Sequence, residues 1–472
     1  MINFLKKIGS FSVGPIIGAL ISFITVPIIT HFISPEEYGK ASMFILAQST
    51  FSAVMYLGMD QAFVREFNIM KKNITKLLYN AMLIPISLSI LTALVSIAFS
   101  KNVSQVLFNT PDETLAVYAL AFLLPFMVIE TFALLKIRME EKGLLYSFYT
   151  ILLKTVILIV TILLFVSYEA SFRSVVYAAS IGEIFTGFLL GIFLIKDNRF
   201  SNKLIDKELQ KKMLKFGVPL VPAFAVGWIL TSMDKVMLRT MCTYEELGVY
   251  SAAFKIVSVL SVLQACFTLY WTPVAYRWYQ EKKEGKSFEN VSKIVTVLMT
   301  TICLGILLLK NLVAIILGND FKKAISIFPF LLLFPVLYTL AETTGIGIGF
   351  KRKTWYNILV SFIAGITNIA LNWLLIPIFS GTGAAMATGL SYIAFFWGKT
   401  LISRKLWYKF DLKIYIIAML IVLLNCTTHT FLSGWIPYTI TGINLIIIFI
   451  YILVFVKKNN IVERFKSGEL FK

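Results

Sequence analysis

Eight ionisable residues lie inside or at the ends of long apolar segments of this 472-residue chain, and their chemistry needs an explanation. They are Glu130, Lys154, Glu183, Asp234, Lys235, Arg239, Lys255 and Glu342. An ionisable group in a membrane span costs about 2.5–3.5 kcal/mol on insertion scales, so it normally faces a partner or a water-filled cavity. Such residues could bind an anionic substrate, take part in ion or proton coupling, or form buried pairs.

Lys154 is the deepest of these residues. It lies about nine residues into the apolar segment 145–167, which places it roughly 14 Å into the membrane at 1.5 Å per residue. A lysine side chain can hardly reach bulk water from that depth. We therefore expect Lys154 either to pair with Glu130 or Glu183, or to face a wet cavity.

Asp234 and Lys255 flank the short polar turn 243–248 at similar distances. Their expected depths differ by only about 3 Å, so they could pair or line one chamber. Lys235 and Arg239 are four residues apart and share a helix face, from which they could meet an anion or simply extend to the membrane surface. Glu342, a candidate pairing residue, precedes a GxxxG sequence of the kind that favours close helix packing.

The composition shows that these charges belong to a polytopic membrane protein. The chain is 58% hydrophobic with a mean hydropathy of +0.82, and only 15% is charged against about 25% in soluble domains. Spanning segments are expected near 10–32, 40–60, 77–99, 114–135, 145–167, 174–195, 216–239, 248–273, 291–309, 324–350, 355–379, 383–402, 412–432 and 436–456. Because helices satisfy their own backbone hydrogen bonds in lipid, we predict an all-α fold of about fourteen transmembrane helices.

The turn at 243–248 repeats an earlier one. At an offset of 209 residues, Ser34-Pro35-Glu36-Glu37-Tyr38-Gly39 aligns with Thr243-Tyr244-Glu245-Glu246-Leu247-Gly248. Six spans per repeat is an even number, so both repeats should cross the membrane in the same direction. We predict two parallel six-helix lobes, 1–200 and 201–405, followed by two additional helices and a basic tail, 406–472.

The basic residues predict the orientation. With the N-terminus in the cytoplasm, 34 of the 44 Lys and Arg fall on the cytoplasmic side and 8 on the outer side. Both termini are therefore expected in the cytoplasm. The net charge of +19 then reflects loops on one side of a bilayer and does not indicate nucleic acid binding.

Catalytic chemistry is not expected. His31 and His429 belong to no metal-ligand spacing, and the four cysteines lie too far apart for a metal site or a disulfide framework. The longest predicted outer loop, about 100–113, is short for a membrane glycan polymerase or ligase. We predict a protein that is not an enzyme and uses no metal or cofactor.

The central hairpin resembles a known family. Asp234-Lys235 followed by Glu245-Glu246-Leu247-Gly248-Val249-Tyr250-Ser251-Ala252-Ala253-Phe254-Lys255 is similar to the bacterial O-antigen and polysaccharide flippases of the multidrug, oligosaccharidyl-lipid and polysaccharide exporter superfamily. The opening Pro27-Ile28-Ile29-Thr30, running into the first turn, resembles them too.

The resemblance implies a flippase of the bacterial cytoplasmic membrane. Its substrate would be an undecaprenyl-diphosphate-linked oligosaccharide of an O-antigen, capsule or similar polysaccharide, and its lobes would form a V-shaped cationic cavity that opens alternately to each side. Polysaccharide-assembly membrane proteins are candidate partners. Lys154, Lys255, Lys235 and Arg239 could meet the diphosphate, whereas Asp234, Glu130, Glu183 and Glu342 are candidates for coupling or pairing. The alternative is a drug/cation antiporter of the same superfamily.

Overall fold

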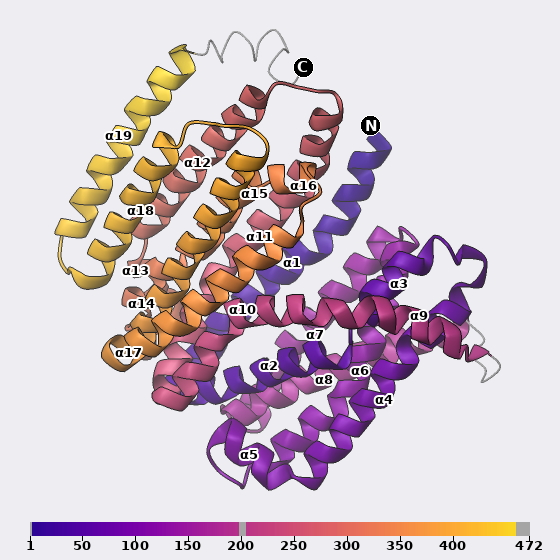
Figure 1. Cartoon of the computed structure of the whole chain (residues 1–472). Helices are drawn as coiled ribbons and strands as arrows, with labels where there is room; N and C mark the ends of the chain where they lie inside the picture. Colours follow the sequence, from indigo (N-terminus) through magenta and orange to yellow (C-terminus); the bar gives the residue numbers. More distant parts are fainter. Residues whose placement is uncertain (1, 198–203, 459–472) are drawn as a thin grey trace. The chain divides into compact units, whose positions relative to one another are not determined.

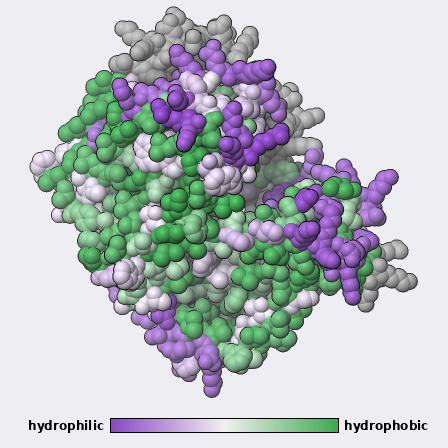
Figure 2. Space-filling view, viewed as in Figure 1, coloured by the Kyte–Doolittle hydropathy of each residue, from purple (hydrophilic) through white to green (hydrophobic). Residues whose placement is uncertain are grey.

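The computed structural model describes residues 2–197 and 204–458, with side chains over 11–196 and 204–451. Within these ranges the chain forms helices joined by short turns (Figure 1). Hydrophobic residues cover most of the face seen in Figure 2. The chain divides into two compact units, residues 1–262 and 263–472, each described by itself below.

The number of spans agrees with the fourteen predicted. Eleven helices of the described chain are long and apolar enough to cross a membrane, and the bent pair Pro35–Met55 and Met59–Phe67 adds a twelfth. The helix Trp355–Leu406 is 52 residues long and breaks at Ser380, where φ is 49° and ψ is −128°, so it supplies two spans. The apolar helix Ile436–Lys458 supplies the last. The protein is thus a multi-pass membrane protein.

Unit 1 contains the first spans and the start of the second repeat. Its helices are α1 (Ile2–Phe32), α2 (Pro35–Met55), α3 (Met59–Phe67), α4 (Ile74–Ala98), α5 (Ser100–Phe108), α6 (Thr114–Met139), α7 (Gly143–Ser167), α8 (Phe172–Asp197), α9 (Lys207–Gly217), α10 (Val221–Met241) and the first part of α11 (Tyr244–Gln280). Helix α1 packs along α7, and α6 packs against both α4 and α8 (Figure 1). Only four of the 25 residues of α7 are buried, namely Gly143, Ser147, Leu153 and Thr161, as expected for a helix with a large face towards lipid.

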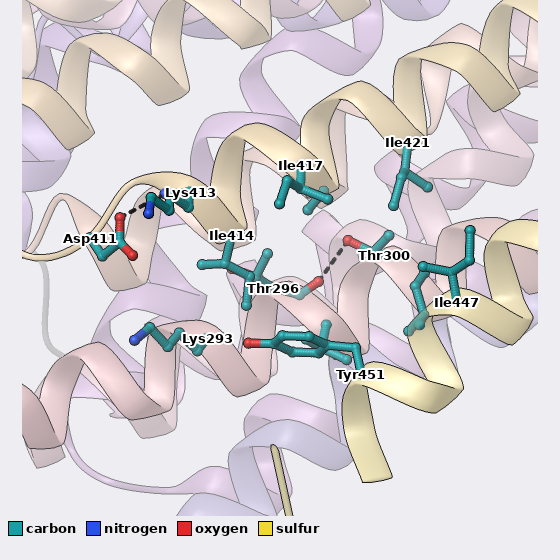
Figure 3. Close-up of a pocket in the computed structure, with 13 residues that line it drawn as sticks. Lys293, Thr296, Thr300, Asp411, Lys413, Ile414, Ile417, Ile421, Ile447 and Tyr451 are labelled. Atoms are coloured by element: carbon teal, nitrogen blue, oxygen red, sulfur yellow. Dashed lines mark hydrogen bonds between the residues drawn. The ribbon is translucent and has the colours of Figure 1, made fainter. Parts of the chain in front are cut away.

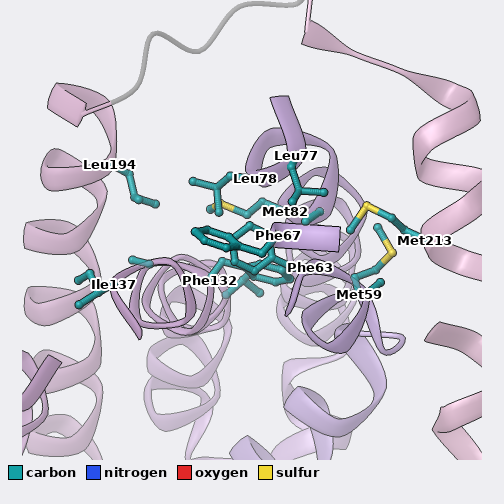
Figure 4. Packing of buried hydrophobic residues seen from close by; sticks show 14 of the residues in the cluster. Met59, Phe63, Phe67, Leu77, Leu78, Met82, Phe132, Ile137, Leu194 and Met213 are labelled. Atoms are coloured by element: carbon teal, nitrogen blue, oxygen red, sulfur yellow. The ribbon is translucent and has the colours of Figure 1, made fainter. Parts of the chain in front are cut away.

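A cluster of buried apolar residues joins α3, α4, α6, α8 and α9. Phe63, Phe67 and Phe132 form its centre (Figure 4), where the ring of Phe63 meets the other two edge-on at centroid distances of 5.7 and 6.3 Å. Met213 of α9 also belongs to this core. Aromatic pairs of this geometry contribute about 0.5–1.5 kcal/mol beyond their buried area. The cluster therefore fixes the helices that carry Glu130 and Glu183.

The basic loop between the repeats contains the amphipathic helix α9. Its residues Leu209 and Met213 face the core, while its lysines face outward. Lys212 forms a 2.6 Å ion pair with Glu66, which is only 3% exposed. Asn80, fully buried on α4, accepts hydrogen bonds from the backbone N–H of Asp206 and from Gln210. The described part of this loop, from residue 204 onwards, is thus bound to α3 and α4.

The two repeated turns have the same local structure. Ser34 accepts a hydrogen bond from the backbone N–H of Glu37, and Thr243, its equivalent at the offset of 209, accepts one from Glu246. Both turns are helix N-caps in which a short hydroxyl side chain satisfies a free N–H. The acidic residues of the first helical turn suit the positive end of the helix dipole.

The two turns also contact each other. A methyl group on Gly39 would overlap the carbonyl oxygen of Tyr244, and one on Gly248 would overlap the carbonyl oxygen of Pro35. Pro35 and Tyr244 are themselves equivalent at the offset of 209. The contact is therefore reciprocal, as two copies related by a two-fold axis require, and it allows no side chain at either glycine.

Unit 2 contains the rest of α11 and seven further α-helices in the described chain besides the four-residue α16. They are α12 (Gly285–Leu308), α13 (Asn311–Leu317), α14 (Ala324–Leu331), α15 (Leu333–Thr344), α16 (Gly347–Phe350), α17 (Trp355–Leu406), α18 (Lys413–Phe431) and α19 (Ile436–Lys458). The segment 324–350 is 78% buried and forms the centre of this unit. Helix α19 packs against α12 and α18.

The predicted lobe boundaries at 200 and 405 stay a prediction. Compactness divides the chain at 262 within α11, and α10 and the start of α11 both contact α2 of the first spans. The boundary at 262 reflects which helices pack together, whereas the boundary at 200 reflects where the sequence repeat begins.

Candidate functional site

Two neighbouring cavities in unit 1 share the residues Lys154 and Lys255. The first, of about 160 Å³, lies among α1, α2, α7, α8 and α11, and Glu183 also lines it. The second, of about 290 Å³, lies among α1, α7 and α11. Both lysines thus face open space, and whether this space holds water, as expected for ionisable residues in a span, stays a prediction.

Close packing of α1 on α7 places Lys154. The backbone N–H of Gly14 donates to the Ser147 hydroxyl at 2.9 Å, and there is no room for a side chain at Gly14. One turn further along α1, Gly18 lies over the aliphatic stem of Lys154, where an added methyl group would be 3.5 Å from Cγ. Small residues let the helix backbones approach, and the lysine stem is held between them.

The two candidate acids of this unit meet each other beside Lys154. The carboxyl groups of Glu130 on α6 and Glu183 on α8 interact electrostatically with each other and with Lys154. Oε2 of Glu130 is buried without a hydrogen-bond partner in the described part of the chain. Lys154 lines both cavities, and no ion pair joins it to either acid among the described side chains, so the choice between its two expected roles stays a prediction.

Lys255 lies among cations. It interacts electrostatically with Lys154 and Lys235, which both repel it. Lys235 lies with its ammonium 5.3 Å from the ring centre of Phe254 and also interacts with Asp234. Like charges gathered in a low dielectric repel strongly, so this cluster favours the arrival of an anion.

Asp234 is bound by a residue that sequence reasoning did not single out. Its carboxylate, 1% exposed, accepts a 2.6 Å hydrogen bond from the hydroxyl of Tyr250. The predicted contact between Asp234 and Lys255, expected in at least one state of transport, stays a prediction. In this conformation the carboxylate bonds to Tyr250.

This bond predicts strong coupling between Asp234 and Tyr250. The single variants Tyr250→Phe and Asp234→Asn should each lower the thermal stability of the purified protein, and the double variant should lose less than their sum. Residues joined by a buried hydrogen bond show interaction energies of about 0.5–3 kcal/mol. The measurement is a double-mutant cycle by thermal unfolding in detergent; additive losses would contradict the contact.

Arg239 lies apart from the cavities. Its guanidinium is 4.7 Å from the ring centre of Tyr244 and donates a 3.3 Å hydrogen bond to the side-chain carbonyl of Asn109. These contacts join the C-terminal ends of α5 and α10 and the N-terminal end of α11. Neither Arg239 nor Lys235 is among the described residues that line the two cavities.

Unit 2 has a separate intramembrane ion pair. Glu342 is bound by Lys399 at 3.1 Å, and the ammonium also lies 5.8 and 5.0 Å from the ring centres of Tyr338 and Phe395. Lys399 lies inside the predicted span 383–402 but is not among the eight ionisable residues that the sequence singled out.

Gln48 is another residue that sequence reasoning missed. Its amide lines the smaller cavity and its nitrogen is buried without a hydrogen-bond partner. The sequence does offer a sign of this site, because Gln48 places a polar amide inside the apolar segment 40–60. The donor is available to a substrate oxygen in the cavity.

Comparisons with known proteins agree on fold and family. The family described as polysaccharide biosynthesis protein matches residues 4–277. Among solved structures, the lipid II flippase MurJ in an inward closed conformation has 16% sequence identity and a TM-score of 0.73, covering 95% of this chain and 99% of that chain. No curated protein matches the sequence.

Transporter structures are similar at lower scores. An outward-facing multidrug resistance MATE family transporter of the MOP superfamily has 12% identity and a TM-score of 0.55, covering 87% of this chain and 96% of that chain. A MOP superfamily transporter from Pyrococcus furiosus has 12% identity and a TM-score of 0.50, with coverages of 90% and 96%. These structures show a shared fold, whereas the family match extends over more than half of the sequence: the protein belongs to the polysaccharide biosynthesis protein family.

Proposed function

We propose that this protein is a flippase that moves a polyprenyl-diphosphate-linked oligosaccharide across the bacterial cytoplasmic membrane by alternating access. The observation that carries the proposal is the pair of lysines, Lys154 and Lys255, facing the same two cavities at membrane depth. A diphosphate is expensive to bring into a low dielectric alone, and ammonium groups offer it charge-assisted hydrogen bonds. Family membership and likeness to a lipid II flippase support the same substrate class.

The acids of the site have a distinct proposed role. Glu130 and Glu183 both interact electrostatically with Lys154, so we propose that they balance its charge when no substrate is bound. An arriving diphosphate would compete with them for the ammonium. Proton uptake by the carboxyl pair would then compensate for the lost cation, which makes these two residues the candidates for coupling.

A drug/cation antiporter is the second candidate. The carboxyl pair and the similar MATE structure favour it, since a cationic drug would need acids in the cavity. Lys154 and Lys255 oppose it, because they would repel such a substrate at close range.

The test is to delete the gene and identify what accumulates. The proposal expects a lipid-linked glycan to build up in the cytoplasmic leaflet, with loss of the corresponding surface polysaccharide. Unchanged surface glycan together with increased sensitivity to cationic drugs would overturn it in favour of the antiporter. No reaction is assigned to the protein itself, so purified protein should leave the glycan chemically unchanged.

The proposed orientation has both termini in the cytoplasm. Single cysteines at Lys101 and Lys353, both exposed, should then behave oppositely in a background that lacks the four native cysteines. Lys101→Cys should react with a membrane-impermeant thiol reagent in intact cells, and Lys353→Cys should react only after the cells are opened. The reverse pattern would invert the topology.

A further inference from the structure

A second kind of site lies in unit 2, apart from the lysine-lined cavities. It is a cavity of about 390 Å³ between α12, α18 and α19, within the usual size range for small-molecule pockets (Figure 3). Ile417 and Ile447 line it and keep 56% and 50% of their surfaces exposed. The cavity is therefore reachable from the apolar outer surface of this unit.

The cavity is polar at one end and apolar at the other. Lys293, Asp411 and Lys413 gather at the end where α18 begins, and Ile421 and Ile447 lie at the other end (Figure 3). From Lys413 to Ile421 is eight residues, or roughly 12 Å along α18. The hydroxyl end of Tyr451 points towards the polar end, where it interacts with Lys293 and Asp411.

The walls offer little to a sugar or another polar ligand. The hydroxyl groups of Thr296 and Thr300 each donate a 2.8 Å hydrogen bond to a backbone carbonyl of their own helix. These bonds occupy the donors, and isoleucines form most of the remaining wall. A cavity of this kind suits a hydrocarbon chain.

The polar end suits one phosphate group. The Lys293 ammonium forms a 2.7 Å ion pair with Glu289. The Lys413 ammonium forms no ion pair with the described side chains. Lys413 thus supplies the positive charge for a phosphate. The Asp411 carboxylate, whose Oδ1 accepts the backbone N–H of Lys413 at 3.1 Å, can accept hydroxyl groups of a headgroup.

We infer that this cavity binds an anionic phospholipid of the surrounding bilayer, with its phosphate at Lys413 and an acyl chain along the isoleucines. In the predicted orientation the polar end faces the cytoplasmic leaflet, where anionic lipids attract basic residues of membrane proteins. The bound lipid fills the space between α19 and the helices that it packs against, α12 and α18. The inference is independent of the transported substrate.

Native mass spectrometry of the full-length protein tests the site. The protein in detergent is titrated with palmitoyl-oleoyl phosphatidylglycerol, and wild type should retain one tightly bound lipid. Ile417→Trp fills the cavity and should lose it. Leu420→Trp, which places the same side chain on the exposed face of the same helix, should retain it. Equal retention by the two tryptophan variants would overturn the proposal.

The headgroup is tested separately. Lys413→Glu should weaken phosphatidylglycerol binding about fivefold or more, the effect of roughly one basic residue at an anionic lipid surface. Lys409→Glu, an exposed neighbour that does not line the cavity, should not. Equal affinity of the wild type for phosphatidylethanolamine, or displacement of phosphatidylglycerol by an equal concentration of polyprenyl phosphate, would contradict an anionic phospholipid site.

Discussion

Replacing Lys154 with glutamine should reduce export of the lipid-linked glycan about tenfold or more, while the protein stays folded and inserted. Charge-assisted hydrogen bonds contribute about 1.5–3 kcal/mol each, and 1.4 kcal/mol corresponds to a factor of ten. Removing a charge at membrane depth also lowers the cost of insertion, so lost stability would not explain the defect. Lys154→Arg keeps the charge in a different shape and should retain part of the activity.

The measurement is surface glycan at matched protein abundance, with Lys101→Gln as the control. Lys101 is an exposed lysine outside both cavities. A second comparison separates substrate binding from charge neutralisation, because Lys154 interacts with two carboxyl groups as well as lining the cavities. If Lys154 serves only to neutralise them, then adding Glu130→Gln or Glu183→Gln should restore export. Such rescue, or full export by Lys154→Gln alone, would refute the role in substrate binding.

Counting residues gives an expected depth for Lys154, which stays a prediction, but it could not choose the neighbours of this residue. Depth follows from counting residues along a helix, whereas the neighbours depend on how α6, α7 and α8 are rotated about their axes. That rotation is set by close contacts such as Gly182 of α8 against Ile157 of α7, which join residues far apart in the chain. The same limit explains why the hydrogen bond from Tyr250 to Asp234 was not predicted.

The linker between the repeats was partly predictable. The segment 196–215 carries seven Lys and Arg, which predicts a cytoplasmic loop, but its apolar residues also follow a helical pattern. Leu209, Met213 and Gly217 recur every four residues and form the buried side of α9. The partners on the other side of the contact, Glu66 and Asn80, could not be found from local sequence, because they lie more than 120 residues away.

The internal repeat predicted two equivalent turns, and the structure adds that they touch. Each copy places a glycine against the backbone of the other, Gly39 against Tyr244 and Gly248 against Pro35. An identical residue at the same place in both repeats could have served two separate local purposes. The reciprocal contact explains both glycines by one requirement, the close approach of two helix ends.

Alanine at Gly39 or Gly248 should therefore destabilise the protein by about 1–3 kcal/mol, the usual cost of overpacking. The atoms in the way are backbone carbonyl oxygens, which cannot rotate aside as a flexible side chain would. Gly227→Ala on α10 is the matched control, because a methyl group there meets nothing within 4 Å. Since alanine favours helix over glycine by about 1 kcal/mol, the control should be neutral or stabilising.

The double variant gives the decisive comparison. Once one methyl group has separated the turns, the second has less to displace, so Gly39→Ala with Gly248→Ala should lose less stability than the two single variants added together. Thermal unfolding followed by size-exclusion chromatography in detergent measures all four proteins on one scale. Additive losses would mean that each glycine serves its own helix. A neutral effect at both positions would mean that the turns do not meet in the folded protein.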